Sequence, residues 1–312
     1  MRRFALMLAM MIAGPALAQE AYPSRPVQLI IPFPPGGNTD LMARAIQAEL
    51  TRELGQPVVA VNRGGAAGAI GNAEIARARP DGYTIGISPN NAITTQPFLQ
   101  NAAYNPESFR FLCLVYDNPQ VVILARNAPF RDFAGMIAHA RTGREALVYG
   151  IPGVGSTQHI LTAQLLRAAG VSGMNVPFAG AGPIAQAALA GQIQMFIESA
   201  AIPAATGLPV IAVLGERRMP SLPDVPSTGE LGYPMAGTTY GGLLAPAGLP
   251  DNIAETIERA CERAVRSDGY RAAAERLNGV PSFLPGNALR DRFLSEARTN
   301  QALLRELGIA RE

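Results

Sequence analysis

The sequence of 312 residues contains no lysine, so arginine is its only strongly basic side chain. A P-loop is therefore excluded, because its phosphate-binding turn requires a Gly-Lys-Ser/Thr step. Only two histidines and two cysteines are present, and none of them has the spacing of a metal-binding motif. The formal net charge of +2 is spread without a basic run, which argues against a nucleic-acid partner. We expect no metal, cofactor or nucleic acid to bind.

The sequence also lacks the common motifs of enzymes. No Gly-x-Ser-x-Gly elbow occurs, and Gly153-Val154-Gly155 lacks the third glycine of a dinucleotide-binding fingerprint. Ser156 and His159 lie three residues apart in a predicted helix. Ser156 is better suited to the N-cap position, which leaves His159 without an obvious catalytic role. We therefore predict that the chain is not an enzyme.

The first eighteen residues have the pattern of a secretory signal peptide. Arg2 and Arg3 precede an apolar run, and the segment ends in the small-residue motif Ala16-Leu17-Ala18. The apolar run is about half the ~20 residues that a membrane-spanning helix needs. We predict cleavage near Ala18, before Gln19, and export through the inner membrane to the periplasm.

The remaining chain alternates short apolar runs with helical patterns, which indicates parallel sheets covered by helices. Its length exceeds what one hydrophobic core usually organises, so we expect two lobes. We assign residues 19–120 and 241–312 to lobe 1 and residues 121–240 to lobe 2. Two apolar segments separated by Asp117-Asn118-Pro119 are predicted as consecutive strands that pass from one lobe to the other.

The two cysteines allow two interpretations. Export to an oxidising compartment makes a disulfide between Cys113 and Cys261 possible. Cys113 lies in an apolar strand pattern and Cys261 in a helix, where each would serve as a small core residue. We favour two separate buried cysteines, without excluding the bond.

Three glycine-rich loops follow predicted strands and lead into predicted helices: residues 32–40, 150–157 and 178–183. Ligands of open parallel sheets bind at such strand ends, and helix N-termini attract anions. We expect Asn38 or Thr39 to cap the first helix and Ser156 to cap the second. Each loop could instead be a plain capped turn. The alternative we favour is that the loops of both lobes together bind one anion.

Several motifs, in this order along the mature chain, resemble the periplasmic receptors of tripartite tricarboxylate transporters, also called Bug-type solute-binding proteins. No single motif decides the resemblance, but together they are specific. They are Tyr22-Pro23-Ser24-Arg25-Pro26, Pro32-Phe33-Pro34-Pro35-Gly36-Gly37 with Thr39-Asp40, Leu54-Gly55-Gln56-Pro57-Val58-Val59 with Asn62-Arg63, Pro80-Asp81-Gly82-Tyr83-Thr84, Gly155-Ser156-Thr157 with His159, Leu222-Pro223-Asp224-Val225-Pro226-Ser227, and Tyr240-Gly241 with Leu243-Leu244-Ala245-Pro246-Ala247-Gly248.

The resemblance implies an α/β fold of the periplasmic-binding-protein (Venus flytrap) type, with crossing strands as the hinge. It also implies a function: the two lobes close around a small organic carboxylate, and membrane subunits of a secondary transporter recognise the closed form. A periplasmic sensor that presents the closed form to a receptor kinase is the alternative, which the sequence does not separate from transport. We expect a monomer.

The resemblance also implies a ligand site, partly water-mediated, at the ends of the strands of both lobes. The residues expected there are Gly36, Gly37, Asn38, Thr39, Asp40, Ser88, Asn90, Asn91, Gly153, Gly155, Ser156, Thr157, His159, Ala179, Gly180, Gly182 and Glu198. Asp40 has two possible roles, because an acid in the first turn of a helix also stabilises the helix dipole.

Two departures from the family pattern bear on the ligand. Family members usually have Tyr-Lys-Gly-Gly where this chain has Phe178-Ala179-Gly180-Ala181, and often an aspartate where Glu198 stands. The missing lysine removes a countercharge for a second or third carboxylate. We therefore predict a monocarboxylate or a small amphipathic acid as ligand, in preference to citrate.

Overall fold

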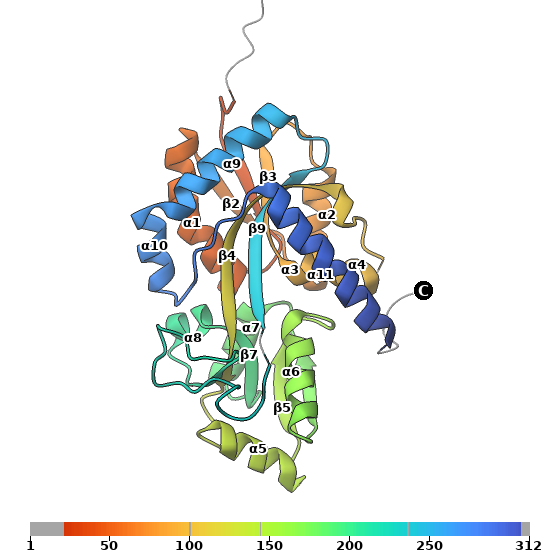
Figure 1. Ribbon diagram of the computed structural model, residues 1–312, viewed down its shortest axis with the longest axis vertical. Helices are drawn as coiled ribbons and strands as arrows, with labels where there is room; N and C mark the ends of the chain where they lie inside the picture. Colours follow the sequence, from red (N-terminus) through yellow and green to blue (C-terminus); the bar gives the residue numbers. More distant parts are fainter. Residues whose placement is uncertain (1–21, 100, 144, 236, 307–312) are drawn as a thin grey trace, which may run out of the picture.

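The structure, a computed structural model, describes residues 22–306 except residues 100, 144 and 236. The predicted signal peptide and its cleavage site lie outside these residues. Figure 1 shows an upper and a lower α/β half joined by two long strands, β4 (Phe109–Leu124) and β9 (Thr238–Pro246), which run through both. The predicted periplasmic-binding-protein fold is confirmed in this arrangement. The proposed lobe boundaries at residues 120 and 241 stay a prediction.

The upper half contains a mixed sheet between two layers of helices. Strands β2 (Val58–Asn62), β1 (Val27–Ile31) and β3 (Thr84–Pro89) are parallel, and β9 and β4 continue the sheet in antiparallel pairing. Side chains of β1 alternate between the faces: Leu29 packs under one helical layer and Ile30 under the other. Both faces of the sheet are thus buried, which explains its apolar sequence.

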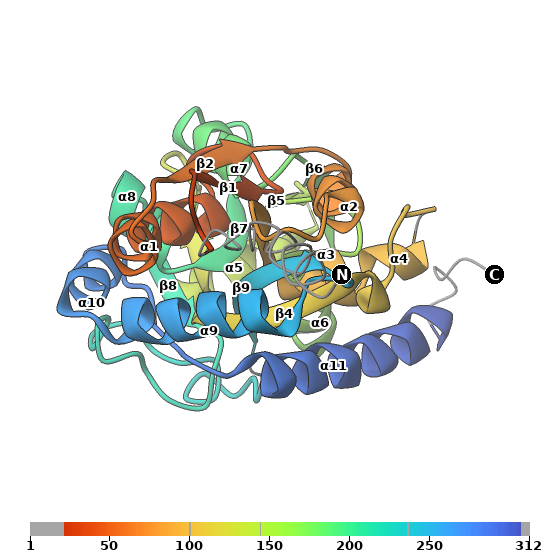
Figure 2. The same ribbon diagram turned by 90° about the horizontal axis from the view of Figure 1, so that it is seen from above.

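Figure 2 looks down on this half and shows the two helical layers on opposite sides of the sheet. The first layer contains α1 (Asn38–Leu54), α9 (Asp251–Arg266) and α10 (Asp268–Glu275). The second contains α2 (Ala69–Arg77), α3 (Asn90–Thr94), α4 (Gln96–Leu99) and α11 (Gly286–Glu306), with the short 3₁₀ segments η1 (Ala66–Gly68) and η2 (Pro106–Ser108) nearby.

The lower half repeats the layered plan around a smaller sheet. Strand β5 (Leu147–Ile151) lies between β6 (Gly173–Pro177) and β7 (Met195–Ser199), all parallel, and β4 pairs with both β7 and β8 (Val210–Val213). Helices α5 (Phe133–Thr142) and α6 (Thr157–Ala168) cover one face, whereas α7 (Ala181–Leu189) and α8 (Ala201–Thr206) cover the other. The sheets of both halves meet along β4.

The predicted break at Asp117-Asn118-Pro119 is wrong, because β4 is one strand of 16 residues. Pro119 pairs with Thr238 of β9, and the next residue, Gln120, pairs with Ser199 of β7. Proline lacks an N–H for the sheet ladder. It is tolerated here because it lies where β4 changes its partner from one strand to another.

The preference for two separate cysteines is also wrong, because Cys113 and Cys261 form a disulfide. The sequence correctly indicates that both residues are buried. It does not reveal that α9 packs directly over β4, which brings the two Cα atoms to 6.6 Å, within the range of a disulfide. The bond attaches the covering helix to the long central strand.

Candidate functional site

A small cavity lies between the two halves, at the strand ends where the predicted loops meet. Its volume is about 30 Å³, which is room for only one or two water molecules in this conformation. The residues that line it come from both halves: Phe33, Gly37, Asn38, Thr39, Pro89, Asn91, Pro152, Gln158, Ala181, Glu198 and Thr239.

The N-terminus of α1 forms one wall of the cavity. The helix begins at Asn38 because Gly37 occupies the N-cap position with extended backbone, and no side chain caps the helix. The predicted capping role of Asn38 or Thr39 is therefore wrong. No described side chain caps the first backbone N–H groups of this helix, which makes the helix start a favourable place for a negative charge.

Asn38 connects the two halves with its side-chain oxygen. Its Oδ1 accepts hydrogen bonds from Asn118 Nδ2 and from Ser199 Oγ, each at 2.8 Å. Its Nδ2 is buried and has no hydrogen-bond partner among the described residues. The amide is therefore oriented by its oxygen, and its two N–H donors are left for a bound group. Beside it, the Thr39 hydroxyl lies 3.2 Å from the hydroxyl of Tyr116.

Glu198 is the acidic side chain of the cavity wall, and it is 2% exposed. Its carboxylate accepts hydrogen bonds from the backbone N–H of Ser199 at 2.9 Å and from Gln158 Nε2 at 3.1 Å. No ion pair with Glu198 is present in the part of the chain that the structure describes. Burial raises the pKa of Glu198 to about 7, although both hydrogen bonds oppose the shift.

Gln158 extends this acidic wall toward the crossing strand β9. Its Nε2 group contacts both Glu198 oxygens and lies 3.3 Å from Thr239 Oγ1. Its Oε1 atom is buried without a hydrogen-bond partner among the described residues. The cavity therefore offers an unpaired donor at Asn38 and an unpaired acceptor at Gln158.

Asp40 lines no part of the cavity, and its carboxylate binds protein groups instead. Oδ2 accepts from the Gly36 N–H at 2.9 Å, and Oδ1 accepts from Asn62 Nδ2 at 2.8 Å and from Arg44 Nε at 3.0 Å. Asp40 is 2% exposed. These contacts give the acid a structural role, because they fix the loop before α1, including the otherwise unpaired N–H of Gly36.

The variant Asp40→Asn should lose stability. An amide has one acceptor oxygen in place of two, so it cannot serve all three donors, and a charge-assisted hydrogen bond is worth about 1.5–3 kcal/mol. We expect the free energy of unfolding to fall by about 1–3 kcal/mol in urea titrations. Loss of ligand affinity with an unchanged melting temperature would instead show a direct ligand role for Asp40.

The start of α6 contains the predicted Gly-Ser-Thr-x-His segment. The predicted cap is confirmed, since the Ser156 hydroxyl accepts from the His159 N–H. His159 Nδ1 in turn accepts from the Gly155 N–H at 3.1 Å, and burial lowers the pKa of His159. The imidazole is therefore neutral. Neither these residues nor Thr157 line the closed cavity; α6 contributes Gln158 in their place.

Predicted glycines lie where the two halves approach each other closely. A Cβ on Gly182, at the start of α7, would lie 2.5 Å from the carbonyl oxygen of Pro35 in the opposite half. A Cβ on Gly155 would overlap the side chain of Leu99, also across the interface. These glycines have a packing role, because a side chain at either position would hold the halves apart.

The remaining predicted site residues lie around the cavity. Asn91 lines it, whereas Asn90 donates to Glu296 of α11 at 2.8 Å and Ser88 Oγ contacts the carbonyl oxygen of Pro89. Gly180 packs beside Pro34. Gly153 and Ala179 line a separate hollow of about 420 Å³ at the junction of the halves, together with Ala66, Ala67, Gln96, Leu99, Val154 and Phe178.

The sequence interpretation does not single out the cavity residues Phe33, Pro152, Gln158 and Thr239. Pro152 and Gln158 adjoin predicted site residues, and Phe33 lies in the predicted loop of residues 32–40, so within these segments the side chain that reaches the cavity differs from the one expected. Thr239 had no signal of its own, because it lies in a crossing strand and not in a strand-to-helix loop. Which side chain of a loop or first helical turn reaches the cavity depends on how the two halves are oriented. Local sequence patterns do not determine this orientation.

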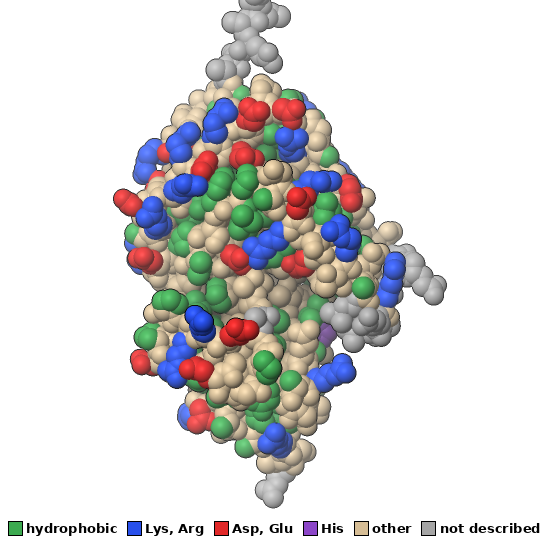
Figure 3. All heavy atoms as spheres, in the orientation of Figure 1, with side chains coloured by type: hydrophobic (Ala, Val, Ile, Leu, Met, Phe, Trp, Pro, Cys, Tyr) green, Lys and Arg blue, Asp and Glu red, His purple; other side chains and the backbone are tan. Residues whose placement is uncertain are grey.

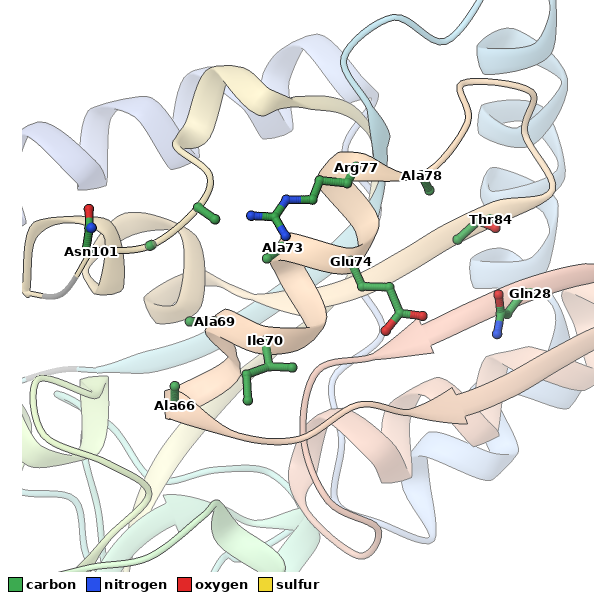
Figure 4. Close-up of a pocket in the computed structure, with 12 residues that line it drawn as sticks. Gln28, Ala66, Ala69, Ile70, Ala73, Glu74, Arg77, Ala78, Thr84 and Asn101 are labelled. Carbon is green, nitrogen blue, oxygen red and sulfur yellow. The ribbon is translucent and has the colours of Figure 1, made fainter.

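A larger hollow of about 740 Å³ lies over α2 and does not join the two halves. Figure 4 shows Glu74 and Arg77 on α2, with Gln28 and Thr84 on the neighbouring strands. All its lining residues fall between positions 28 and 103, within the upper half. This large groove therefore lacks the opposing loops that meet in the small cavity.

Charged side chains of both signs are interspersed over the face of the molecule in Figure 3.

Metal-binding clusters and membrane-spanning helices are both absent from the described part of the chain. No group of three or more histidine, cysteine, aspartate or glutamate side chains there could hold a metal ion. None of the helices that the structure describes has both the length and the hydrophobicity needed to cross a bilayer.

Comparison with known proteins identifies relatives over nearly the full length. Residues 42–309 match the model of the tripartite tricarboxylate transporter family receptor. The chain is 30% identical to protein BugT of Bordetella pertussis, over 95% of this chain and 93% of that protein.

Solved structures agree with this assignment. MatC from Rhodopseudomonas palustris, with bound malate, has a TM-score of 0.81 at 25% identity and covers 91% of this chain and 100% of that one. A second R. palustris protein, with adipate, has a TM-score of 0.87 at 26% identity and covers 93% and 99%. The chain therefore belongs to the family of periplasmic solute-binding receptors of tripartite tricarboxylate transporters, which are not enzymes.

Proposed function

We propose that the mature protein, beginning at Gln19, acts in the periplasm as a monomer that binds a small monocarboxylate in the interlobe cavity and presents it to membrane subunits. The observation that supports this proposal is the unpaired Asn38 Nδ2, which lies in the cavity beside the free N–H groups of α1. Such donors suit one carboxylate group, because they supply hydrogen bonds and a partial positive charge.

The chemistry of the cavity favours a single negative charge on the ligand. The lining residues include no arginine, lysine or histidine, and the one ionisable group among them is the acid Glu198. A second or third carboxylate would be buried without a countercharge, which is costly.

The size of the cavity bears on both ligand and mechanism. The relatives described above contain malate and adipate, which are dicarboxylates. A volume of about 30 Å³ is far below the several hundred Å³ of usual ligand pockets, so the halves must separate to admit any acid. To close over a small ligand, the two halves need to stay less far apart than to close over a long one. Closure then creates the surface that the membrane subunits recognise.

Isothermal titration calorimetry tests this proposal. The mature protein is titrated with acetate, propionate, lactate and pyruvate, and with malate, adipate and citrate. We expect at least one monocarboxylate to bind more tightly than every di- or tricarboxylate. Tight binding of citrate would contradict the preference, and failure of all seven acids to bind would contradict carboxylate capture.

The variant Asn38→Asp tests the proposed donor. Aspartate keeps the oxygen that accepts from Asn118 and Ser199, but it replaces the two N–H donors by a negatively charged acceptor. We expect the affinity for the best monocarboxylate to fall between about tenfold and a hundredfold, because one hydrogen bond to a charged group is worth about 1.5–3 kcal/mol. Unchanged affinity would exclude Asn38 as a ligand group.

Asn252→Asp serves as the matched control. Asn252 is exposed in the first turn of α9, so the same substitution there adds a charge to a helix start away from the cavity. Its affinity should equal that of the unmodified protein.

A further inference from the structure

Glu198 poses an electrostatic problem for a receptor of carboxylates. Its side chain lines the same cavity of about 30 Å³ that the ligand would enter, and it is 2% exposed. Two carboxylates that share a buried site cannot both ionise without strong repulsion, so one of them retains a proton. The proton is needed unless a neighbouring cation neutralises Glu198.

Among the residues that the structure describes, the elements packed against Glu198 supply no cation. From α6 it contacts Gln158, whose Nε2 also reaches Thr239 of β9. On β4 its paired residue is Val121. Tyr116, also on β4, interacts with it electrostatically, but burial raises the pKa of that hydroxyl well above its ordinary value, so it stays neutral.

The residues that α1 and α7 contribute to the cavity wall are also uncharged. They are Asn38, Thr39 and Ala181. The acid Asp40 is bound to Gly36, Asn62 and Arg44, and it lines no part of the cavity. Among the described residues around this cavity, Glu198 is therefore the one group that can change its charge near neutral pH.

We propose that the protein captures its carboxylate together with one proton, which Glu198 takes up from solvent and shares with the bound carboxylate as a hydrogen-bond donor. This inference rests on the proposed function. Protonation converts Glu198 from a repulsive group into a second hydrogen-bond donor in the cavity that Asn38 also lines. The hydrogen bonds from Ser199 N–H and Gln158 Nε2 hold the side chain in place in both protonation states. Glu198 thereby sets both the charge of the accepted ligand and the pH range of capture.

The sign of the pH dependence follows from this linkage. Burial already raises the pKa of Glu198 to about 7 in the ligand-free cavity, and a bound anion raises it further. Between pH 6 and pH 8 the protonated fraction of the free receptor falls from about 0.9 to about 0.1. The affinity should therefore fall about tenfold over this range as pH rises.

Proton uptake is the direct measurement. Lactate and pyruvate are suitable probes, because their carboxyl groups stay ionised throughout this pH range. Calorimetric titrations in two buffers of different ionisation enthalpy give the number of protons bound. We expect an uptake of about 0.9 proton per ligand at pH 8 and about 0.1 at pH 6.

The variant Glu198→Gln provides the decisive comparison. Glutamine resembles the protonated acid, since it has one acceptor oxygen and one donor group and carries no charge. We expect its affinity to be independent of pH, its proton uptake to be zero, and its binding at pH 8 to be about tenfold tighter than that of the unmodified protein. Glu255→Gln is the matched control, because Glu255 is exposed on α9 away from the cavity, so the same substitution there should leave the pH profile unchanged.

The possible outcomes separate the two proposals. Lactate or pyruvate binding without proton uptake, and with the same affinity at pH 6 and pH 8, would overturn the inference and leave carboxylate capture intact. Affinity for lactate or pyruvate that falls on acidification would also overturn it, because it would show that the receptor binds the acid with Glu198 ionised. No binding of either acid or of the other five at any pH would contradict the proposed function itself.

Discussion

Replacing Gly182 by alanine is expected to weaken ligand affinity between about tenfold and a hundredfold while the protein keeps its fold. The added Cβ would lie 2.5 Å from the carbonyl oxygen of Pro35, a backbone atom of the opposite half that cannot move independently. Overpacking of this kind costs about 1–3 kcal/mol, and the cost applies only to the closed state. The variant should therefore favour the open state and resist closure.

The stability of the ligand-free Gly182→Ala variant distinguishes blocked closure from misfolding. Gly182 lies in the first turn of α7 without a left-handed backbone, directly before Pro183, so an alanine there also carries a small local cost from contact with the proline ring. The ligand-free variant should therefore still unfold cooperatively, with a melting temperature at or slightly below that of the unmodified protein. Gly248→Ala is the matched control, because its Cβ would meet Pro80 at an ordinary 3.7 Å. Unchanged affinity in calorimetry would show that closure does not need the contact between residues 35 and 182.

Removal of the disulfide should produce the largest loss of stability. The bond between Cys113 and Cys261 spans 148 residues, and the chain-entropy model predicts about 5 kcal/mol for a loop of this length. Observed effects are often smaller, so we expect the double variant Cys113→Ala/Cys261→Ala to lose about 3–5 kcal/mol. Urea unfolding, followed by circular dichroism, measures this difference. A loss below about 1 kcal/mol would contradict the expected role of the bond.

The same double variant should keep nearly the same affinity for the ligand. Both cysteines belong to the core between the upper sheet and α9, and neither lines the interlobe cavity. The dissociation constant for a monocarboxylate should therefore change less than about twofold where the variant is folded. A much larger change would indicate that the disulfide also controls how β4 bends between the halves.

The predictions made from the sequence are of unequal success, and the difference has a physical origin. Strand β1, helix α1 and the cap at Ser156 depend on local patterns of apolar residues, on glycine and on a hydroxyl group, which the chain carries within a few positions. The same local patterns identify the loops that flank the cavity. They do not predict that Asn90 binds Glu296, because these residues are 206 positions apart.

Two errors show where local patterns mislead. Asp117-Asn118-Pro119 has the composition of a turn, yet β9 and β7 supply pairing partners on either side of Pro119, so the strand continues. Asn38 has the composition of a cap, yet Gly37 takes that position and Asn38 is bound by Asn118 and Ser199 instead. In both cases distant residues determine the structure.

The sequence by itself determined the alternation of strands and helices, the absence of a lysine countercharge and the family to which the chain belongs. These properties depend on residue types and on short spacings. Only the tertiary structure decided which side chains face the cavity, that Asp40 supports a loop, and that Cys113 is bonded to Cys261. Burial and hydrogen-bond partners arise when segments far apart in the chain pack together, and the charge state of Glu198 depends on that packing.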